Sequence, residues 1–226
     1  MRKQPLYIMA TLFLLVSCTT ENQTPTELEP MEDVVENIPS ESNEDDGTAI
    51  IGTLQDVERF YTPELVDSLQ ALGFFFRLGD TPPIIEGAYQ VTPFVLQASL
   101  VPTDSIGSQF ADQIITFSNQ DNTAQTIDFE IEGGAQTTIG SGSFISGTDN
   151  QFSVFLITQS KTDESVLVDT TVSITGIVTA EGIQNLQFAG LMLDDKGDPD
   201  DLYISNNTGR LIVDQDSISP RAEPSG

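Results

Sequence analysis

The sequence predicts an all-β fold, an antiparallel up-and-down barrel of about eight strands preceded by one short helix. From Ile84 onward, apolar and polar residues alternate with a period of two, as in strands that bury one face. Short turns rich in Gly, Asp and Asn separate these runs, and no long crossover interrupts them. A two-sheet β-sandwich is the alternative. We favour a barrel because closure removes the edges that strands rich in Val and Ile would expose.

The single expected helix begins at Thr62, whose side chain is a good N-cap, and Pro63 suits the first helical position. Gly73 is a typical C-terminal stop. Its apolar face has helical spacing and comprises Leu65, Val66, Leu69 and Leu72. The triplet Phe74–Phe76 follows, which predicts either a packed plug or an aromatic patch that contacts a ligand.

The expected strands can be placed one after another along the chain. They cover Glu86 to Ala98, Gln113–Ser118, Ile127–Glu132, Thr137–Ile145, Phe152–Thr158, Val166–Val178, Gln184–Leu193 and Gly209–Asp214. Ile127–Glu132 has the clearest alternation, because its apolar residues would face the core and Asp128, Glu130 and Glu132 would face water.

The amino terminus has the layout of a secretory signal peptide. Arg2 and Lys3 precede an apolar run, Leu6 to Val16, that is too short to span a bilayer as a helix. The run ends in Leu15-Val16-Ser17-Cys18, which resembles the lipobox of bacterial lipoproteins. That resemblance implies cleavage before Cys18 and acylation of its thiol. It also accounts for a lone cysteine in an exported chain.

These signals divide the chain into five parts. Residues 1–17 are the signal peptide, 18–53 the lipidated cysteine and an acidic disordered tether, and 54–81 the helix and a connector. Residues 82–219 form the barrel and 220–226 a disordered tail. The tether is rich in acidic residues and prolines and contains no Lys or Arg. This composition predicts an extended spacer. A sorting signal next to the cysteine is the alternative interpretation.

Composition excludes several classes of function. The chain has 35 acidic against 8 basic residues and a net charge of −27, so we expect no binding to nucleic acid. It has no histidine and one cysteine, which removes histidine-based catalysis, thiol catalysis and the usual zinc sites. We therefore expect a protein that is not an enzyme.

Two positions resemble the lipocalin–calycin superfamily. Gly87-Ala88-Tyr89 is similar to its Gly-x-Trp motif, with tyrosine in place of tryptophan, and Arg210 matches the arginine that packs across that ring. The run Pro82 to Tyr89 also resembles a group of Bacteroidota lipoproteins with lipocalin-like domains. The resemblance implies that Tyr89 and Arg210 form a structural pair between the first and last strands.

Lipocalin-like barrels commonly hold a small apolar molecule. The residues expected to line such a cavity are Phe117, Phe129, Phe152 and Phe188. The same rings would equally fill the interior of a small barrel, and the sequence leaves both possibilities open.

The Asp-rich segment from Asp194 to Asp201 is the densest charge cluster. Asp194, Asp198 and Asp200 surround a glycine and offer oxygen ligands to a cation such as Ca²⁺. No other cofactor is indicated. Because Lys196 lies inside the cluster and no EF-hand pattern is present, a solvated turn is the favoured interpretation.

The sequence therefore predicts a lipoprotein of the cell envelope, anchored by acyl chains to the outer membrane or cell surface of a Gram-negative bacterium. Its barrel would carry a small hydrophobic ligand. The alternative is a packed, non-enzymatic module that meets an unknown protein partner.

Overall fold

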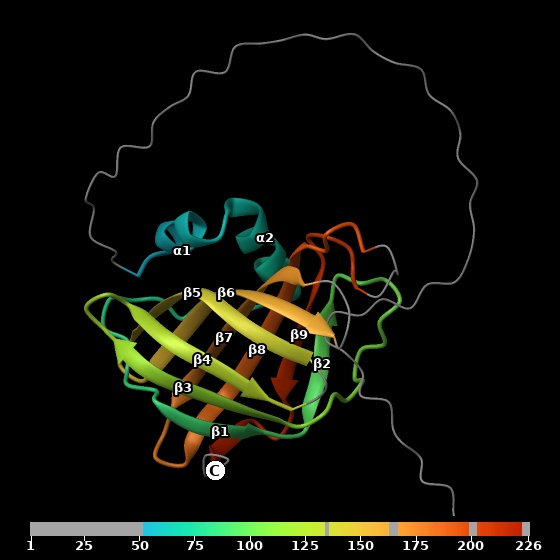
Figure 1. Ribbon diagram of the computed structural model, residues 1–226. Helices are drawn as coiled ribbons and strands as arrows, with labels where there is room; N and C mark the ends of the chain where they lie inside the picture. The colour runs from blue at the N-terminus through green and yellow to red at the C-terminus, as the bar shows by residue number, and fades with distance from the viewer. Residues whose placement is uncertain (1–51, 134–135, 163–166, 199–202, 223–226) are drawn as a thin grey trace, which may run out of the picture.

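The computed structural model describes residues 52–133, 136–162, 167–198 and 203–222. The lipobox, Cys18 and most of the acidic tether lie outside these residues, as does Asp200 of the Asp-rich segment. Two helices and ten strands make up the described structure. The helices lie together on one side of a barrel (Figure 1).

The ten strands correspond to eight barrel strands, because two of the eight are each divided in two. Their bounds are β1 Gly87–Val91, β2 Phe94–Ser99, β3 Gln113–Asp121, β4 Thr126–Glu132, β5 Gln136–Thr148, β6 Gln151–Thr162, β7 Val168–Val178, β8 Gly182–Asp194, β9 Gly209–Asp214 and β10 Ile218–Ala222. The predicted first strand breaks at Thr92-Pro93, where proline offers no N–H to the ladder. The last strand divides at the turn between β9 and β10.

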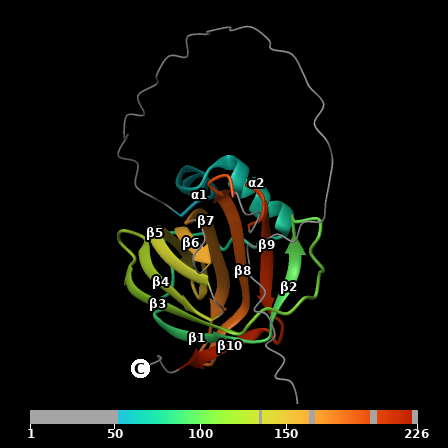
Figure 2. The ribbon, with the colours of Figure 1, turned by 45° about the vertical axis from the view of Figure 1, so that its right-hand side comes forward.

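The first and last strands pair, which joins the two ends of the meander. β1 lies antiparallel to β10, with Tyr89 opposite Arg221. β2 lies antiparallel to β9, with Leu96 opposite Ile212. The remaining neighbours follow chain order, so the hydrogen-bonded path runs β4-β3-β1-β10-β8-β7-β6-β5 (Figure 2). The predicted up-and-down antiparallel architecture is confirmed.

The barrel is nearly closed, and its weakest join lies between β4 and β5. These two strands end the hydrogen-bonded path and do not continue it into a ring. Hydrogen bonds near the join include Ile145 N–H to the carbonyl of Gln125 at 2.8 Å and Ile127 N–H to Ser143 Oγ at 3.0 Å.

Helix α2, Pro63–Leu72, forms as the sequence predicts. Thr62 Oγ1 accepts from Leu65 N–H, Pro63 occupies the first turn, and Gly73 adopts the left-handed conformation at φ 81°. Its buried residues are Leu65, Val66, Leu69 and Leu72.

Helix α1, Leu54–Phe60, was not predicted, so the expectation of one helix is wrong. It begins with a capping box in which Thr53 Oγ1 accepts from Asp56 N–H and the Asp56 carboxylate accepts from Thr53 N–H. Seven residues are too few for a helix that is stable alone. Packing on the barrel therefore stabilises it.

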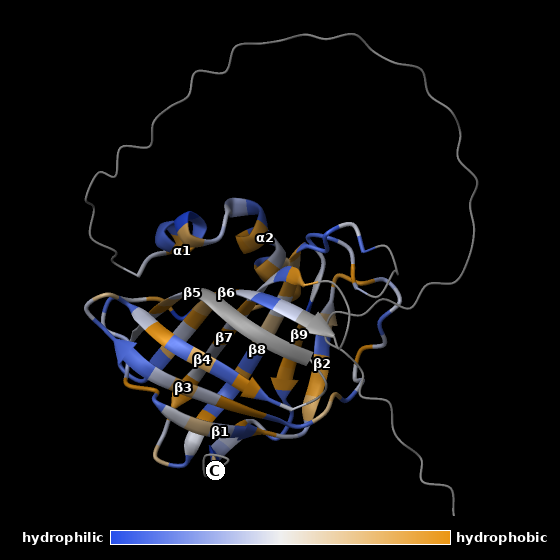
Figure 3. Cartoon of the chain, viewed as in Figure 1, coloured by the Kyte–Doolittle hydropathy of each residue, from blue (hydrophilic) through white to orange (hydrophobic). Residues whose placement is uncertain are grey.

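Two hydrophobic layers hold the molecule together. The inner layer fills the barrel with residues such as Phe94, Ile115 and Phe152. The outer layer lies between the helices and one barrel wall, where Leu69 and Tyr61 join Phe155 and Leu211. This wall is therefore apolar on both faces, whereas β4 alternates between polar and apolar residues (Figure 3). Asp128, Glu130 and Glu132 are exposed there, as predicted.

Tyr61 attaches the helices to the sheet. Its ring is 6 % exposed, and its hydroxyl accepts from Leu156 N–H at 2.9 Å and lies 2.9 Å from the carbonyl oxygen of Val172. Burial raises the pKa of this hydroxyl above its usual value, so it remains a hydrogen-bond donor.

The structure moves two predicted boundaries. The predicted tether includes Gly52 and Thr53, but the Gly52 carbonyl accepts from Gly79 N–H at 3.0 Å, so these residues belong to the folded part. At the other end, β10 runs to Ala222, so residues 220–222 belong to the barrel and not to a tail.

In the described part of the chain, no helix has the length and apolar character needed to cross a membrane.

Candidate functional site

The aromatic residues expected to line a cavity belong mainly to the inner core. Phe117, Phe152 and Phe188 are 1 %, 0 % and 2 % exposed. Phe117 packs against two other rings of this set, with its ring centroid 6.2 Å from that of Phe152 and 6.1 Å from that of Phe129. Phe129 is half-buried.

The arginine over the Tyr89 ring is Arg221 and not Arg210. The Arg221 guanidinium carbon lies 5.1 Å from the ring centroid, because Arg221 is opposite Tyr89 in the β1–β10 register. The expected type of contact is present, but its arginine lies on β10, which is absent from the predicted strands.

Arg210 has a different role. Its guanidinium binds both carboxylate oxygens of Asp104, with Nε–Oδ2 at 2.6 Å and a second contact at 2.7 Å. Arg210 is opposite Ser99 in the register, and the Ser99 hydroxyl also donates to Asp104 at 2.6 Å. The pair ties the loop between β2 and β3 to β9.

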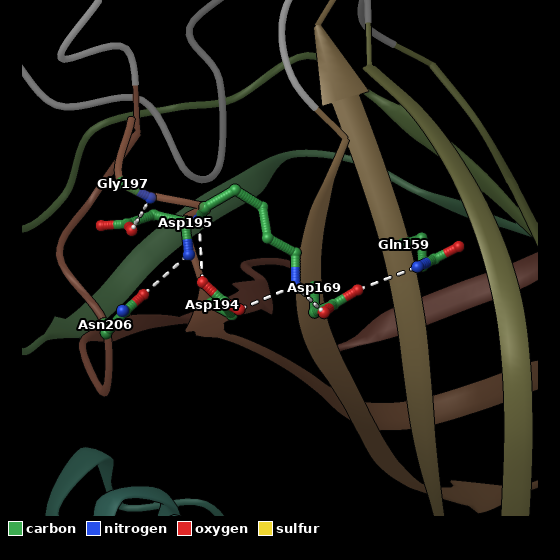
Figure 4. Close-up of polar contacts among 7 residues, drawn as sticks. Gln159, Asp169, Asp194, Asp195, Gly197 and Asn206 are labelled. Atoms are coloured by element: carbon green, nitrogen blue, oxygen red, sulfur yellow. Dashed lines mark hydrogen bonds and ion pairs between the residues drawn. The ribbon is translucent and has the colours of Figure 1, made fainter. Parts of the chain in front are cut away.

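The Asp-rich turn contains its own cation. The Lys196 ammonium group forms ion pairs with Asp194, at 2.7 Å, and with Asp169 on β7. Figure 4 shows these contacts, with Gln159 donating to the other oxygen of Asp169. Asp198 accepts from Tyr203 N–H at 2.7 Å. Lysine and backbone donors thus bind the carboxylates of Asp194 and Asp198, and the described residues hold no group of three potential metal ligands. Asp200, the third expected Ca²⁺ ligand, lies outside the described residues.

A different site lies on the outer wall, which we call the connector groove. It holds about 300 Å³ and is bounded by the chain that leaves α2 and by strands β2, β8 and β9. Its lining residues are Phe75, Arg77, Gln97, Asn185, Leu186, Gln187, Val213, Asp214, Gln215 and Ser217. Five of these ten side chains are uncharged and carry both donors and acceptors.

An aromatic ring and a guanidinium form one side of the connector groove. Phe75 is 60 % exposed, and the Arg77 guanidinium carbon lies 4.8 Å from its ring centroid. Arg77 is held in place because its backbone N–H donates to Ser153 Oγ and its Nη1 donates to Thr175 Oγ1, both at 2.8 Å. Its Nε is buried without a hydrogen-bond partner among the described residues.

The triplet Phe74–Phe76 divides between the two roles that the sequence left open. Phe74 and Phe76 pack against Phe155 in the outer core. Phe75 points away from that core because neighbouring residues of an extended chain alternate in direction. Its backbone N–H donates to Gln187 Oε1 at 2.8 Å, which fixes the connector on β8.

The carboxyl group of Asp214 is not part of the groove surface. Asp214 is opposite Phe94, a residue of the inner core, so its side chain turns toward the barrel interior. There, burial is the largest of the causes that raise the pKa of Asp214 to about 6; the neighbouring Asp216 carboxylate also raises it, whereas the hydrogen bond that Ser219 donates lowers it.

Sequence reasoning did not identify the connector groove, since its residues come from four separate segments. The only available signal was the aromatic triplet after Gly73. No family model matches the chain. Searches among curated proteins and among solved structures find no match either. The strand order of this nearly closed antiparallel barrel is consistent with a lipocalin-like fold.

Proposed function

We propose that this protein is a lipid-anchored, non-enzymatic binding protein of the cell envelope, and that it binds a neutral saccharide in the connector groove. The observation that carries this proposal is the exposed Phe75 ring held among carboxamide side chains. The packed inner core argues for a barrel that serves as a scaffold, with recognition on its outer wall.

The chemistry of the connector groove favours a neutral, hydroxyl-rich ligand. Gln97, Asn185 and Gln215 are exposed and present carboxamides, which both donate to and accept from hydroxyl groups. The electron-rich face of an aromatic ring suits the C–H face of a sugar. A net charge of −27 disfavours anionic ligands, and the polar rim disfavours wholly apolar ones.

Arg77 would orient such a ligand. Its Nε–H has no hydrogen-bond partner among the described residues, and a buried polar group left unpaired costs about 1–3 kcal/mol. A ligand atom that accepts from this N–H would recover part of that cost and so favour binding. The guanidinium also packs against one face of the Phe75 ring and so holds the ring at the side of the groove.

The test is a panel of neutral and acidic oligosaccharides immobilised on a surface and probed with the full chain. We expect binding to neutral members, lost in Phe75→Ala. Ile106→Ala is the matched control, since Ile106 is 62 % exposed and lies outside the groove. Absence of saccharide binding, or equal binding by the Phe75→Ala variant, would reject the proposal.

Membrane anchorage is tested separately. The lipobox-like Leu15 to Cys18 predicts acylation of Cys18, and two or more chains hold a protein stably on a bilayer. Cys18→Ala should move the protein from the membrane fraction to the soluble fraction. The proposed anchorage would be rejected if mass spectrometry found no acyl groups on the mature chain, or if the Cys18→Ala variant stayed in the membrane fraction.

A second candidate is a small hydrophobic ligand inside the barrel. One observation favours it: Phe129 and Ile131 on β4 share the inward face with buried Ile127 but are only half-buried. An apolar fluorescent probe should then be bound and lose affinity in Phe129→Asp. Binding that responds to Phe75→Ala instead would place the probe in the connector groove.

A further inference from the structure

A second cavity lies beside helix α1 and shares no lining residue with the connector groove. It holds about 280 Å³. Its lining residues are Asp56, Arg59 and Phe60 of α1, Ala124 and Gln125 of the β3–β4 turn, Thr126 of β4, and Ser143 and Phe144 of β5. We call it the α1 cavity. It adjoins the weak join between β4 and β5.

The central feature of the α1 cavity is the side chain of Gln125. Gln125 is 3 % exposed, and neither its Nε2 nor its Oε1 has a hydrogen-bond partner in the described structure. Each buried polar group left unpaired costs about 1–3 kcal/mol, so a carboxamide with both ends unpaired is a substantial loss of stability. A bound group that pairs with both ends would recover it.

The backbone of Gln125 makes the choice of glutamine more unusual. Its φ is 52°, in the left-handed region where Gly, Asn and Asp are the residues that turns usually place. Its carbonyl accepts from Ile145 N–H at 2.8 Å, so the join between β4 and β5 fixes this conformation. A long side chain at such a position, buried and unpaired, serves neither the turn nor the core.

The rest of the lining defines the ligand. Phe60 and Phe144 lie 6.0 Å apart between ring centroids and supply an apolar wall. Arg59 and Asp56 form an ion pair at 3.3 Å, so the charges in the lining largely balance. The volume is slightly below the range of about 300–1,000 Å³ that is typical of drug-sized pockets, which restricts the ligand to a small molecule.

From these observations we propose that the α1 cavity binds a small neutral molecule that carries a carboxamide next to an apolar ring or chain. The carboxamide pairs with Gln125, its N–H donating to Oε1 and its oxygen accepting from Nε2. The apolar part packs between Phe60 and Phe144. This site is independent of the connector groove.

Benzamide is a suitable probe, because it joins a carboxamide to one aromatic ring. The experiment follows the side-chain NH₂ resonances of Gln125 by NMR in the full chain carrying Cys18→Ala. We expect a saturable shift with benzamide and contacts between the benzamide ring and the Phe144 ring. Benzoate, which has the same shape but is an anion without a donor, should give at least tenfold weaker binding.

Gln125→Leu should abolish the benzamide response, and Gln215→Leu in the connector groove should retain it. No saturable shift, or an equal affinity in Gln125→Leu, would overturn the proposal and leave water as the partner of the carboxamide. If Gln125→Leu does not fold, the contacts to Phe144 in the unsubstituted site decide the question. Their absence counts against the proposal.

Discussion

Arg221 on β10 lies across the ring of Tyr89 on β1, with 5.1 Å between the guanidinium carbon and the ring centroid. Arg221 also donates to the carbonyl of Glu86 at 3.2 Å. Since β1 and β10 are the first and last strands in chain order, this contact joins residues that lie at opposite ends of the barrel sequence. Gly87 leaves room for it, because a Cβ there would lie 2.6 Å from Arg221 Nη1.

Arg221→Ala should lower the free energy of unfolding by about 0.5–1 kcal/mol, the range for a cation–π contact at an exposed site. Urea denaturation measures the change. Arg221→Lys retains the charge and should recover part of the loss. A larger effect in Arg221→Lys than in Arg221→Ala would contradict the assignment.

Arg210→Ala should lower the free energy of unfolding by about 3–5 kcal/mol, which is more than the change expected for Arg221→Ala. The substitution leaves the largely buried Asp104 carboxylate without its ion-pair partner. Asp104→Asn together with Arg210→Ala should cost less than the sum of the single changes. A double-mutant cycle measured by urea denaturation gives this coupling, and strictly additive effects would show that the two side chains do not interact.

The same pair predicts acid sensitivity. Burial opposes ionisation of Asp104, but hydrogen bonds from Arg210 and Ser99 outweigh it and hold the pKa of Asp104 below its usual value. A lowered carboxyl pKa stabilises the fold above the unfolded-state value, near pH 4, and this stability is lost as the pH falls further. Thermal unfolding at pH 3 and pH 6 should therefore differ less in Asp104→Asn than in the unsubstituted protein.

Asp214 predicts the opposite trend at a higher pH. Its raised pKa, about 6, means that the folded protein keeps a proton which the unfolded chain loses near pH 4. This group therefore destabilises the fold as the pH rises from about 4 to 6. Asp214→Asn should remove that loss and raise the melting temperature at pH 7.5 more than at pH 4.5. Equal shifts at both pH values would argue against ionisation as the cause.

Tyr61→Phe should lower stability by about 1–3 kcal/mol, because it removes the acceptor of the buried Leu156 N–H. Tyr89→Phe is the matched control. The Tyr89 hydroxyl donates to the carbonyl of Ile85 at 3.0 Å, and loss of this bond should lower the free energy of unfolding by about 0.5–1.5 kcal/mol. Chemical denaturation compares the two, and equal losses would show that the Tyr61 hydroxyl does not serve the sheet.

The sequence by itself determined the local structure of this protein. The cap at Thr62, the stop at Gly73 and the alternation from Ile127 to Glu132 are each read from a few neighbouring residues, and the structure confirms them. The capping box between Thr53 and Asp56 is equally local, so α1 could have been predicted.

Only the tertiary structure decided which distant side chains meet. Strand register placed Arg221 and not Arg210 over Tyr89, and it brought Asp169 to Lys196 across 27 positions of the chain. The tertiary structure also brought Gln125 and residues of α1 and β5 around one cavity. Periodicity shows which face of a strand is buried, but contacts between strands depend on register and on how the helices pack, and neither is encoded within a few neighbouring residues.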